Sequence, residues 1–183
     1  MYLFEPRLRQ VRSRTTVTVM ASTSEHPAVR RVLAVLAEHG IDPEVRHLPD
    51  AVRTAQAAAD ALGVTPAEIA NSLIFVGTTD TAQTEPVLVL ASGGHRVDTD
   101  TVAAATGLRI GRADADFVRS RTGFTIGGVA PVGHLTPPRV IVDTALAAFP
   151  AVWAAAGHSH VVFRTTCAEL LTVTGGLPLD VAG

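Results

Sequence analysis

The sequence contains no lysine, and all fifteen of its basic residues are arginines. Any mechanism that needs a lysine amine is therefore excluded. The single cysteine, Cys167, excludes an internal disulfide and cannot by itself form a zinc site. No apolar run approaches the ~18 residues of a membrane-spanning helix. We therefore expect a cytoplasmic protein without membrane contact, and 183 residues suffice for one hydrophobic core.

The charge is unevenly distributed along the chain. The first nineteen residues carry four arginines against Glu5, a net charge of +3, so the rest of a chain of net charge −2 carries −5. RNA affinity comes largely from neutralised phosphates, so an acidic body would hold RNA on a local patch or at its terminal nucleotide. The segment 1–25 has no helical or strand period. It has three interpretations: a basic RNA-binding arm, an arginine-rich targeting peptide, or an unstructured extension ahead of a start at Met20. We favour the extension, with one domain over residues 26–183.

Hydrophobic periodicity and capping residues predict short, alternating helices and strands. We expect helices at 27–39, 54–62, 100–106, 114–121, 145–156 and from 167 onward, and strands at 44–48, 73–76, 87–91, 140–142 and 160–163. The residues Thr65-Pro-Ala-Glu68 have the form of a capping box with proline at the first helical position, which predicts another short helix. Such alternation indicates a single α/β or α+β domain.

One stretch, Thr122-Gly-Phe-Thr-Ile-Gly-Gly-Val-Ala-Pro-Val-Gly133, combines glycines and a proline with no ionisable side chain. Glycine suits a backbone of positive φ, or a place where another molecule approaches bare main chain. We therefore expect a fixed loop with exposed amides between Gly127 and Pro131. Such amides suit a carbonyl or an oxyanion. On composition alone, a purely structural turn is the simpler interpretation.

The residues Thr122, Gly123, Gly127, Gly128, Pro131 and Gly133 form the pattern T-G-x-x-x-G-G-x-x-P-x-G. This pattern resembles the YbaK/EbsC family of aminoacyl-tRNA editing domains, also called the prolyl-tRNA synthetase associated domain. Further matches in the family's order extend the resemblance over about residues 27–182: Arg53-Thr-Ala, Ala58, Ala59, Leu62-Gly63, Ser72-Leu73, Arg96-Val97-Asp98 and Ala156-Gly157. The resemblance implies a compact mixed sheet wrapped by helices, no cofactor, and the 3′ end of aminoacyl-tRNA as ligand, with a synthetase as a further candidate partner.

The resemblance also implies a mechanism and the residues that carry it out. Backbone amides would stabilise the oxyanion, while the ribose hydroxyl beside the ester assists a water and no protein nucleophile is needed. The amides would come from Gly127, Gly128, Val129 and Ala130. Pro131, which has no N–H, would complete the catalytic loop.

At position 71 the chain departs from the family pattern. Where the family usually carries a lysine, this chain has Asn71 ahead of Ser72. Asn71 can donate and accept hydrogen bonds but provides no charge. We predict a catalytic role for Asn71 and substrate binding by Ser72, with His95 and Arg96 as candidate replacements for the missing cation. The alternative for Asn71 is a bond to local backbone.

Four more residues are candidates for substrate binding: Asp98, Asp143, Gly157 and His158. Asp143 matches a family aspartate, and a carboxylate there would hold the substrate's ammonium or a ribose hydroxyl. For Asp98 a turn or helix cap is at least an equal alternative. For each histidine taken alone, a surface position without function is the favoured interpretation. His158 and His160 would share one face of a strand, but two imidazoles without a third ligand do not make a metal site, so we expect none.

These features together predict a free-standing trans-editing deacylase that serves translation fidelity. It would hydrolyse the ester of tRNA mischarged with a small amino acid such as Cys, Ala or Ser, with tRNA for proline as one candidate. The alternative is a catalytically weakened protein that binds aminoacyl-adenosine-like ligands or a synthetase. Asn71 and the acidic charge balance favour this alternative.

Overall fold

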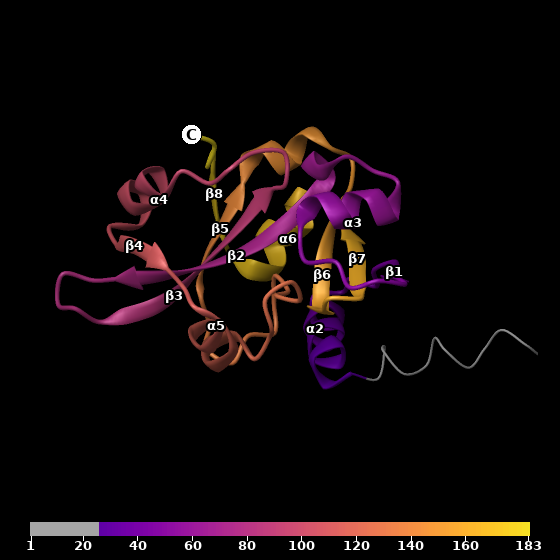
Figure 1. The fold of residues 1–183 in the computed structure, drawn as a ribbon, viewed down its shortest axis with the longest axis horizontal. Helices are drawn as coiled ribbons and strands as arrows, with labels where there is room; N and C mark the ends of the chain where they lie inside the picture. The colour runs from indigo at the N-terminus through magenta and orange to yellow at the C-terminus, as the bar shows by residue number, and fades with distance from the viewer. Residues whose placement is uncertain (1–25) are drawn as a thin grey trace, which may run out of the picture.

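The computed structural model describes residues 26–183 and shows a mixed sheet of eight strands with helices on both faces (Figure 1). The segment 1–25, with the predicted extension, lies outside the described residues. The helices are α2 (Pro27–Glu38), α3 (Ala55–Leu62), α4 (Thr99–Thr106), α5 (Ala115–Thr122) and α6 (Cys167–Thr174), with the 3₁₀ turns η1 (Pro66–Glu68) and η2 (Thr144–Ala148). The strands are β1 (Val45–His47), β2 (Ile69–Thr78), β3 (Thr84–Ser92), β4 (Arg109–Arg112), β5 (Arg139–Asp143), β6 (Val152–His158), β7 (Val161–Thr165) and β8 (Leu177–Leu179).

Strand β2 is the branch point of the sheet. The strand order is β1-β7-β6-β2-β3-β5-β8, and β4 pairs with β2 outside this path. Along one edge, β2 pairs with β3 over its whole length. The other edge is shared, because β6 pairs with Ile69 and Ala70 while β4 pairs with residues 75–78. Between Asn71 and Ile74, no strand of the described chain pairs with this edge. The sheet therefore opens beside Asn71.

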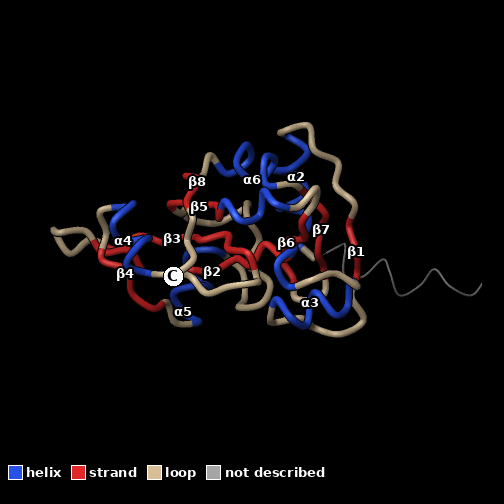
Figure 2. Tube along the Cα trace, turned by 90° about the horizontal axis from the view of Figure 1, so that it is seen from above, coloured by secondary structure: helices blue, strands red, loops and turns tan. Residues whose placement is uncertain are grey.

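The core lies on both faces of the sheet, as the alternation of strand side chains requires. On β7, Val161 and Phe163 pack in the cluster that contains Val32 of α2, whereas Val162 packs in the cluster that contains Ala59 of α3. Figure 2 shows α2 and α6 on one side of the sheet and α3 on the other. Two helical layers thus enclose β6 and β7.

The helix predicted at 145–156 is wrong. The chain forms η2, passes Pro150, and continues as β6. Alanine has the highest helix propensity, but helix propensity is only a weak local preference, and tertiary contacts override it. Here β6 lies between β7 and β2, and its alanines Ala154 and Ala156 are at most 1% exposed. The pairing of β6 with both neighbouring strands, rather than the helix preference of its alanines, therefore sets its conformation.

Other predictions hold with shifted ends. Helices predicted at 54–62, 100–106 and 114–121 correspond to α3, α4 and α5, and each ends at a glycine in the left-handed conformation. The capping box at Thr65 forms, with the Thr65 N–H donating to the Glu68 carboxylate at 2.8 Å, but it caps only the three-residue η1. Strands β4 and β8 were not predicted. Strand β2 begins at Ile69, so Asn71 lies inside a strand rather than before one.

Candidate functional site

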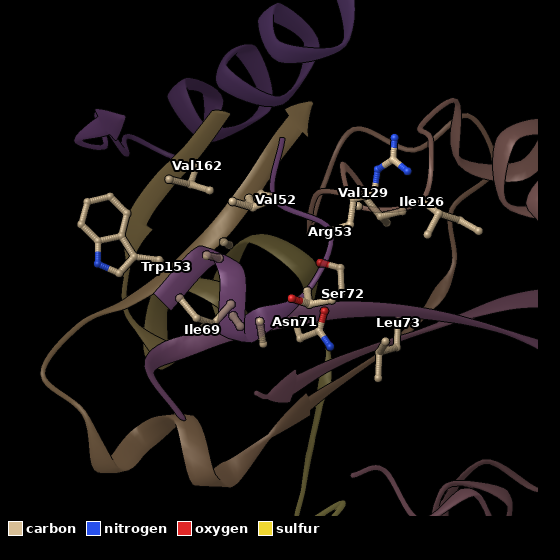
Figure 3. A pocket seen from close by; sticks show the side chains of 17 residues that line it. Val52, Arg53, Ile69, Asn71, Ser72, Leu73, Ile126, Val129, Trp153 and Val162 are labelled. Carbon is tan, nitrogen blue, oxygen red and sulfur yellow. The ribbon is translucent and has the colours of Figure 1, made fainter. Parts of the chain in front are cut away.

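A pocket of about 260 Å³ lies where β2 separates from β6 (Figure 3). Its walls come from the segment that leads into α3, from β2, β6 and β7, and from the glycine-rich loop. Most of the lining is apolar, and its largest apolar members are Ile69, Leu73, Ile126 and Trp153. The pocket therefore offers an apolar interior next to an unpaired strand edge.

The glycine-rich loop is held rigidly beside this pocket. The Thr122 hydroxyl donates to the Val118 carbonyl at 2.6 Å and accepts from the Phe124 amide at 3.0 Å, which fixes the chain as it leaves α5. Further along, Val129 and Ala130 are at most 5% exposed and belong to the main core. Because core packing fixes the loop, its amides are preorganised rather than mobile.

The structure separates the predicted loop residues into three groups. The Gly128 amide donates to the Thr125 carbonyl at 2.9 Å within a tight turn, so this donor is already engaged. The amides of Gly127 and Val129 have no acceptor among residues 26–183, and both residues line the pocket. Ala130 and Pro131 are buried and do not line it. The amides available to a ligand are therefore those of Gly127 and Val129.

Asn71 and Ser72 line the same pocket from β2 (Figure 3). The Ser72 hydroxyl is buried and has no hydrogen-bond partner within the described part of the chain. A buried hydroxyl without a partner costs free energy, which a ligand that bonds it would recover. The structure thus brings Asn71 and Ser72 to the same cavity as the glycine-rich loop, which lies more than fifty residues further along the sequence.

Gly157 and His158 lie behind the loop rather than in the pocket lining. A register shift between β6 and β7 places Gly157 at φ +91°, where a Cβ would meet the Ala28 carbonyl oxygen at 3.0 Å. The His158 ring lies 5.0 Å from the His26 ring and 5.4 Å from the His160 ring, between centroids. Burial, followed by the two neighbouring histidines, lowers the His158 pKa. His158 is therefore held mainly neutral against the back of the loop.

The remaining predicted site residues lie outside this pocket. The buried Asp143 carboxylate accepts hydrogen bonds from the Ser92 amide at 2.8 Å and the Ala145 amide at 3.0 Å, and lies 2.7 Å from Nε2 of His95. Asp98 is the N-cap of α4, and its hydrogen bonds with Thr101 and then Asp100 lower its pKa. None of His95, Arg96, Asp98 and Asp143 lines the pocket of Asn71.

Arg53 is a further candidate site residue that was not predicted from the sequence. Among residues 26–183, Arg53 is the one ionisable residue that lines the pocket. It directly precedes Thr54, whose hydroxyl accepts a hydrogen bond from the Ala57 amide at 3.1 Å and caps α3. Its place in the Arg53-Thr-Ala match was the available signal, but nothing local indicated that this segment meets β2 and the glycine-rich loop.

Within residues 26–183, no helix has the length and apolar character needed to cross a bilayer. The same residues contain no group of three or more His, Cys, Asp or Glu side chains arranged to hold a metal ion.

Known proteins are similar to this chain in sequence and in fold. Residues 49–173 match the family model of the aminoacyl-tRNA editing domain. The chain is 32% identical over 117 residues to "Uncharacterized protein YwhH" of Bacillus subtilis (strain 168), covering 64% of this chain and 72% of that protein. It is 39% identical to a crystal structure of "a putative trans-editing enzyme for prolyl tRNA synthetase", with a TM-score of 0.77 over 86% of this chain and 98% of the other. A scaffold protein from "epitope backbone grafting by computational design" is 37% identical, with a TM-score of 0.78 over 86% and 99% of the two chains.

The fold is a mixed α/β domain whose sheet opens onto a largely apolar pocket beside the glycine-rich loop. The chain belongs to the aminoacyl-tRNA editing domain family. The family resemblance and the mixed α/β fold inferred from the sequence are thereby confirmed. Family membership makes aminoacyl-tRNA the class of substrate.

Proposed function

We propose that this protein is a free-standing trans-editing deacylase that hydrolyses the ester bond between a small amino acid and the 3′ ribose of a mischarged tRNA. The observation that carries the proposal is the meeting of the Gly127 and Val129 amides with an apolar pocket at the open edge of β2. The relative named as a trans-editing enzyme for prolyl-tRNA synthetase supports tRNA for proline as one substrate.

The chemistry needs only groups that the loop and the substrate supply. A water adds to the ester carbonyl, and the negative charge that forms on the carbonyl oxygen is stabilised by the amides of Gly127 and Val129. The ribose hydroxyl beside the ester passes the proton of the water to the departing ribose oxygen. The products are the free amino acid and a tRNA with both terminal hydroxyls.

The pocket supports a preference for small amino acids. Its larger apolar members, together with Ala58, Ala154 and Ala155, surround a space of about 260 Å³. A single methylene in such a pocket changes binding by about 1–3 kcal/mol, so discrimination rests mainly on size. The unpartnered Ser72 hydroxyl provides one polar contact, which would favour Ser or Cys over Ala.

The alternative, a binding protein without turnover, is favoured by one observation. Asn71 occupies a lining position where a lysine would supply charge, and no lysine exists elsewhere in the chain. In this case the pocket would hold an aminoacyl-adenosine-like ligand without hydrolysing it, or a synthetase would use the same surface.

The test is deacylation of a panel of labelled aminoacyl-tRNAs. The panel contains Cys- and Ala-charged tRNA for proline, then Ser- and Thr-charged tRNAs, with Pro-charged tRNA for proline as the correctly charged control. We expect turnover of at least one small-amino-acid species above spontaneous hydrolysis, with the control spared. No turnover across the panel, by protein shown to be folded, would reject the enzyme in favour of the binding protein.

A further inference from the structure

The ionisable lining of the pocket carries charge of one sign only, which is positive. In the part of the chain that the structure describes, Arg53 is the one ionisable residue that lines the pocket, and no Asp or Glu does. This local pattern runs against the chain as a whole, whose net charge is −2. Within residues 26–183, the Arg53 side chain takes part in none of the three ion pairs. The guanidinium is therefore available to an anionic group of a ligand.

The position of Arg53 is fixed by its neighbours. Its backbone is set by Thr54, the N-cap of α3. Its stem lies against Gly127, where φ is +88° and a Cβ would come within 3.1 Å of the Arg53 Cγ. In Figure 3 the guanidinium extends beside Val129 and Ile126, away from Asn71 and Ser72. Arg53 thus brings positive charge to the loop side of the pocket, not to the position of the missing lysine.

A second feature favours an anion at the same place. Thr54 and Ala55, at the start of the eight-residue helix α3, both line the pocket. The first amides of a helix lack intrahelical acceptors and carry the positive end of the helix dipole. The charge of Arg53 and the start of α3 therefore act in the same direction.

We propose that Arg53 binds the phosphodiester on the 5′ side of the terminal adenosine of the substrate RNA. This inference rests on the proposed function for the identity of the ligand. The amino acid itself carries an ammonium, which a guanidinium repels, so the part of the ligand at Arg53 is not the amino acid. The next charged group along the RNA is this phosphodiester, whose paired oxygens match the fork of an arginine.

The test compares two small esters of one amino acid: the 3′ ester of adenosine, which has no phosphate, and the 3′ ester of cytidylyl-adenosine, which has one. The key variant is Arg53→Met, which keeps an unbranched stem against Gly127 but removes the charge. Arg109→Met is the matched control, because Arg109 is exposed on β4 and does not line the pocket. The measured quantity is the ratio of kcat/KM for the dinucleotide ester to kcat/KM for the nucleoside ester.

We expect Arg53→Met to lower this ratio about tenfold, as for the loss of a hydrogen bond to a charged group, mainly through KM. Arg53→Lys should retain part of the ratio, and Arg109→Met should retain all of it. With whole aminoacyl-tRNA, the slope of log kcat/KM against log salt concentration should become about 0.7 less steep, the value for one phosphate contact on a single strand. An unchanged ratio in folded Arg53→Met would overturn the proposal.

A binding measurement separates this proposal from the proposed function. Uncharged cytidylyl-adenosine and adenosine are titrated into wild type and Arg53→Met by calorimetry. If wild type shows no deacylation but binds the dinucleotide more tightly than the nucleoside, and only when Arg53 is present, the phosphate site stands and the deacylase does not. If wild type is active but has no preference for the dinucleotide, the deacylase stands and the phosphate site is wrong.

Discussion

Arg31 on α2 donates a hydrogen bond from its Nε to the carbonyl oxygen of Gly133, although 102 residues separate them. The same guanidinium lies 4.9 Å from the centroid of the Phe124 ring. Phe124 and Gly133 stand near the two ends of the glycine-rich loop. One side chain of α2 therefore fixes both ends of the loop that would stabilise the oxyanion.

Replacing Arg31 should destabilise the fold. Arg31→Met leaves the Gly133 carbonyl without its donor and removes the cation from the Phe124 ring, and we expect a loss of about 1–3 kcal/mol in the free energy of unfolding. Urea denaturation measures this value. Arg30→Met is the control, because Arg30 is exposed on the same helix turn. Equal stability of the two variants would show that the Arg31 contacts contribute nothing.

Stability should fall in acid because of His134. Burial, and secondarily the charge of Arg31, lowers the His134 pKa to about 4, although a hydrogen bond with the Ala130 backbone opposes this. An unfolded histidine titrates near 6.5. Between pH 6.5 and pH 4, His134 is therefore protonated in the unfolded chain but neutral in the folded chain. The free energy of unfolding should drop between pH 6.5 and pH 4 by about 3 kcal/mol.

His134→Gln removes this titration. Its free energy of unfolding, measured by denaturant titration at pH values from 7 to 4, should depend on pH less steeply than that of wild type. His39→Gln is the control, since His39 is exposed at the end of α2 and should keep the steep profile. A His134→Gln profile parallel to that of wild type would assign the acid sensitivity to other groups.

Adding the missing charge at position 71 should preserve or raise activity. In Asn71→Lys the new ammonium enters a pocket that no Asp or Glu of residues 26–183 lines, and we expect kcat/KM for aminoacyl-tRNA between the wild-type value and about tenfold above it. Asn71→Gln lengthens the side chain without adding charge, so it separates the effect of side-chain length from the effect of charge. If Asn71→Lys abolishes a measurable wild-type activity, Asn71 itself performs a role that a lysine cannot.

Locally encoded features could be predicted from the sequence. Asp98, Asp114 and Thr166 each accept a hydrogen bond from an amide in the first turn of their helix, and Gly107 and Gly123 end helices with positive φ. These signals need only neighbouring residues, so a single sequence reveals them. Strand β6 was misread because its alanines favour a helix locally, whereas its pairing with β2 and β7 is a property of the whole fold.

The composition of the site depended on contacts distant in sequence. Asn71, Ser72 and Gly127 meet in the pocket as the family pattern suggested, whereas Asp143 instead holds His95 and the Ser92 amide. No local pattern distinguishes a carboxylate that binds a ligand from one that binds a neighbouring loop. Which amides remain available also could not be predicted, because it depends on the turn that engages Gly128.

The most direct test of the deacylase is single-turnover hydrolysis by Gly128→Val. A Cβ at Gly128 would lie 3.1 Å from the Cα of His158, so the loop must shift, whereas a Cβ at Gly111 has no atom nearer than the Val76 oxygen at 3.7 Å. With the panel substrate that wild type hydrolyses fastest, we predict a rate at least ~10²-fold lower for Gly128→Val and unchanged for the control Gly111→Val, both folded by circular dichroism. A wild-type rate in folded Gly128→Val would remove the loop from the mechanism and contradict the account.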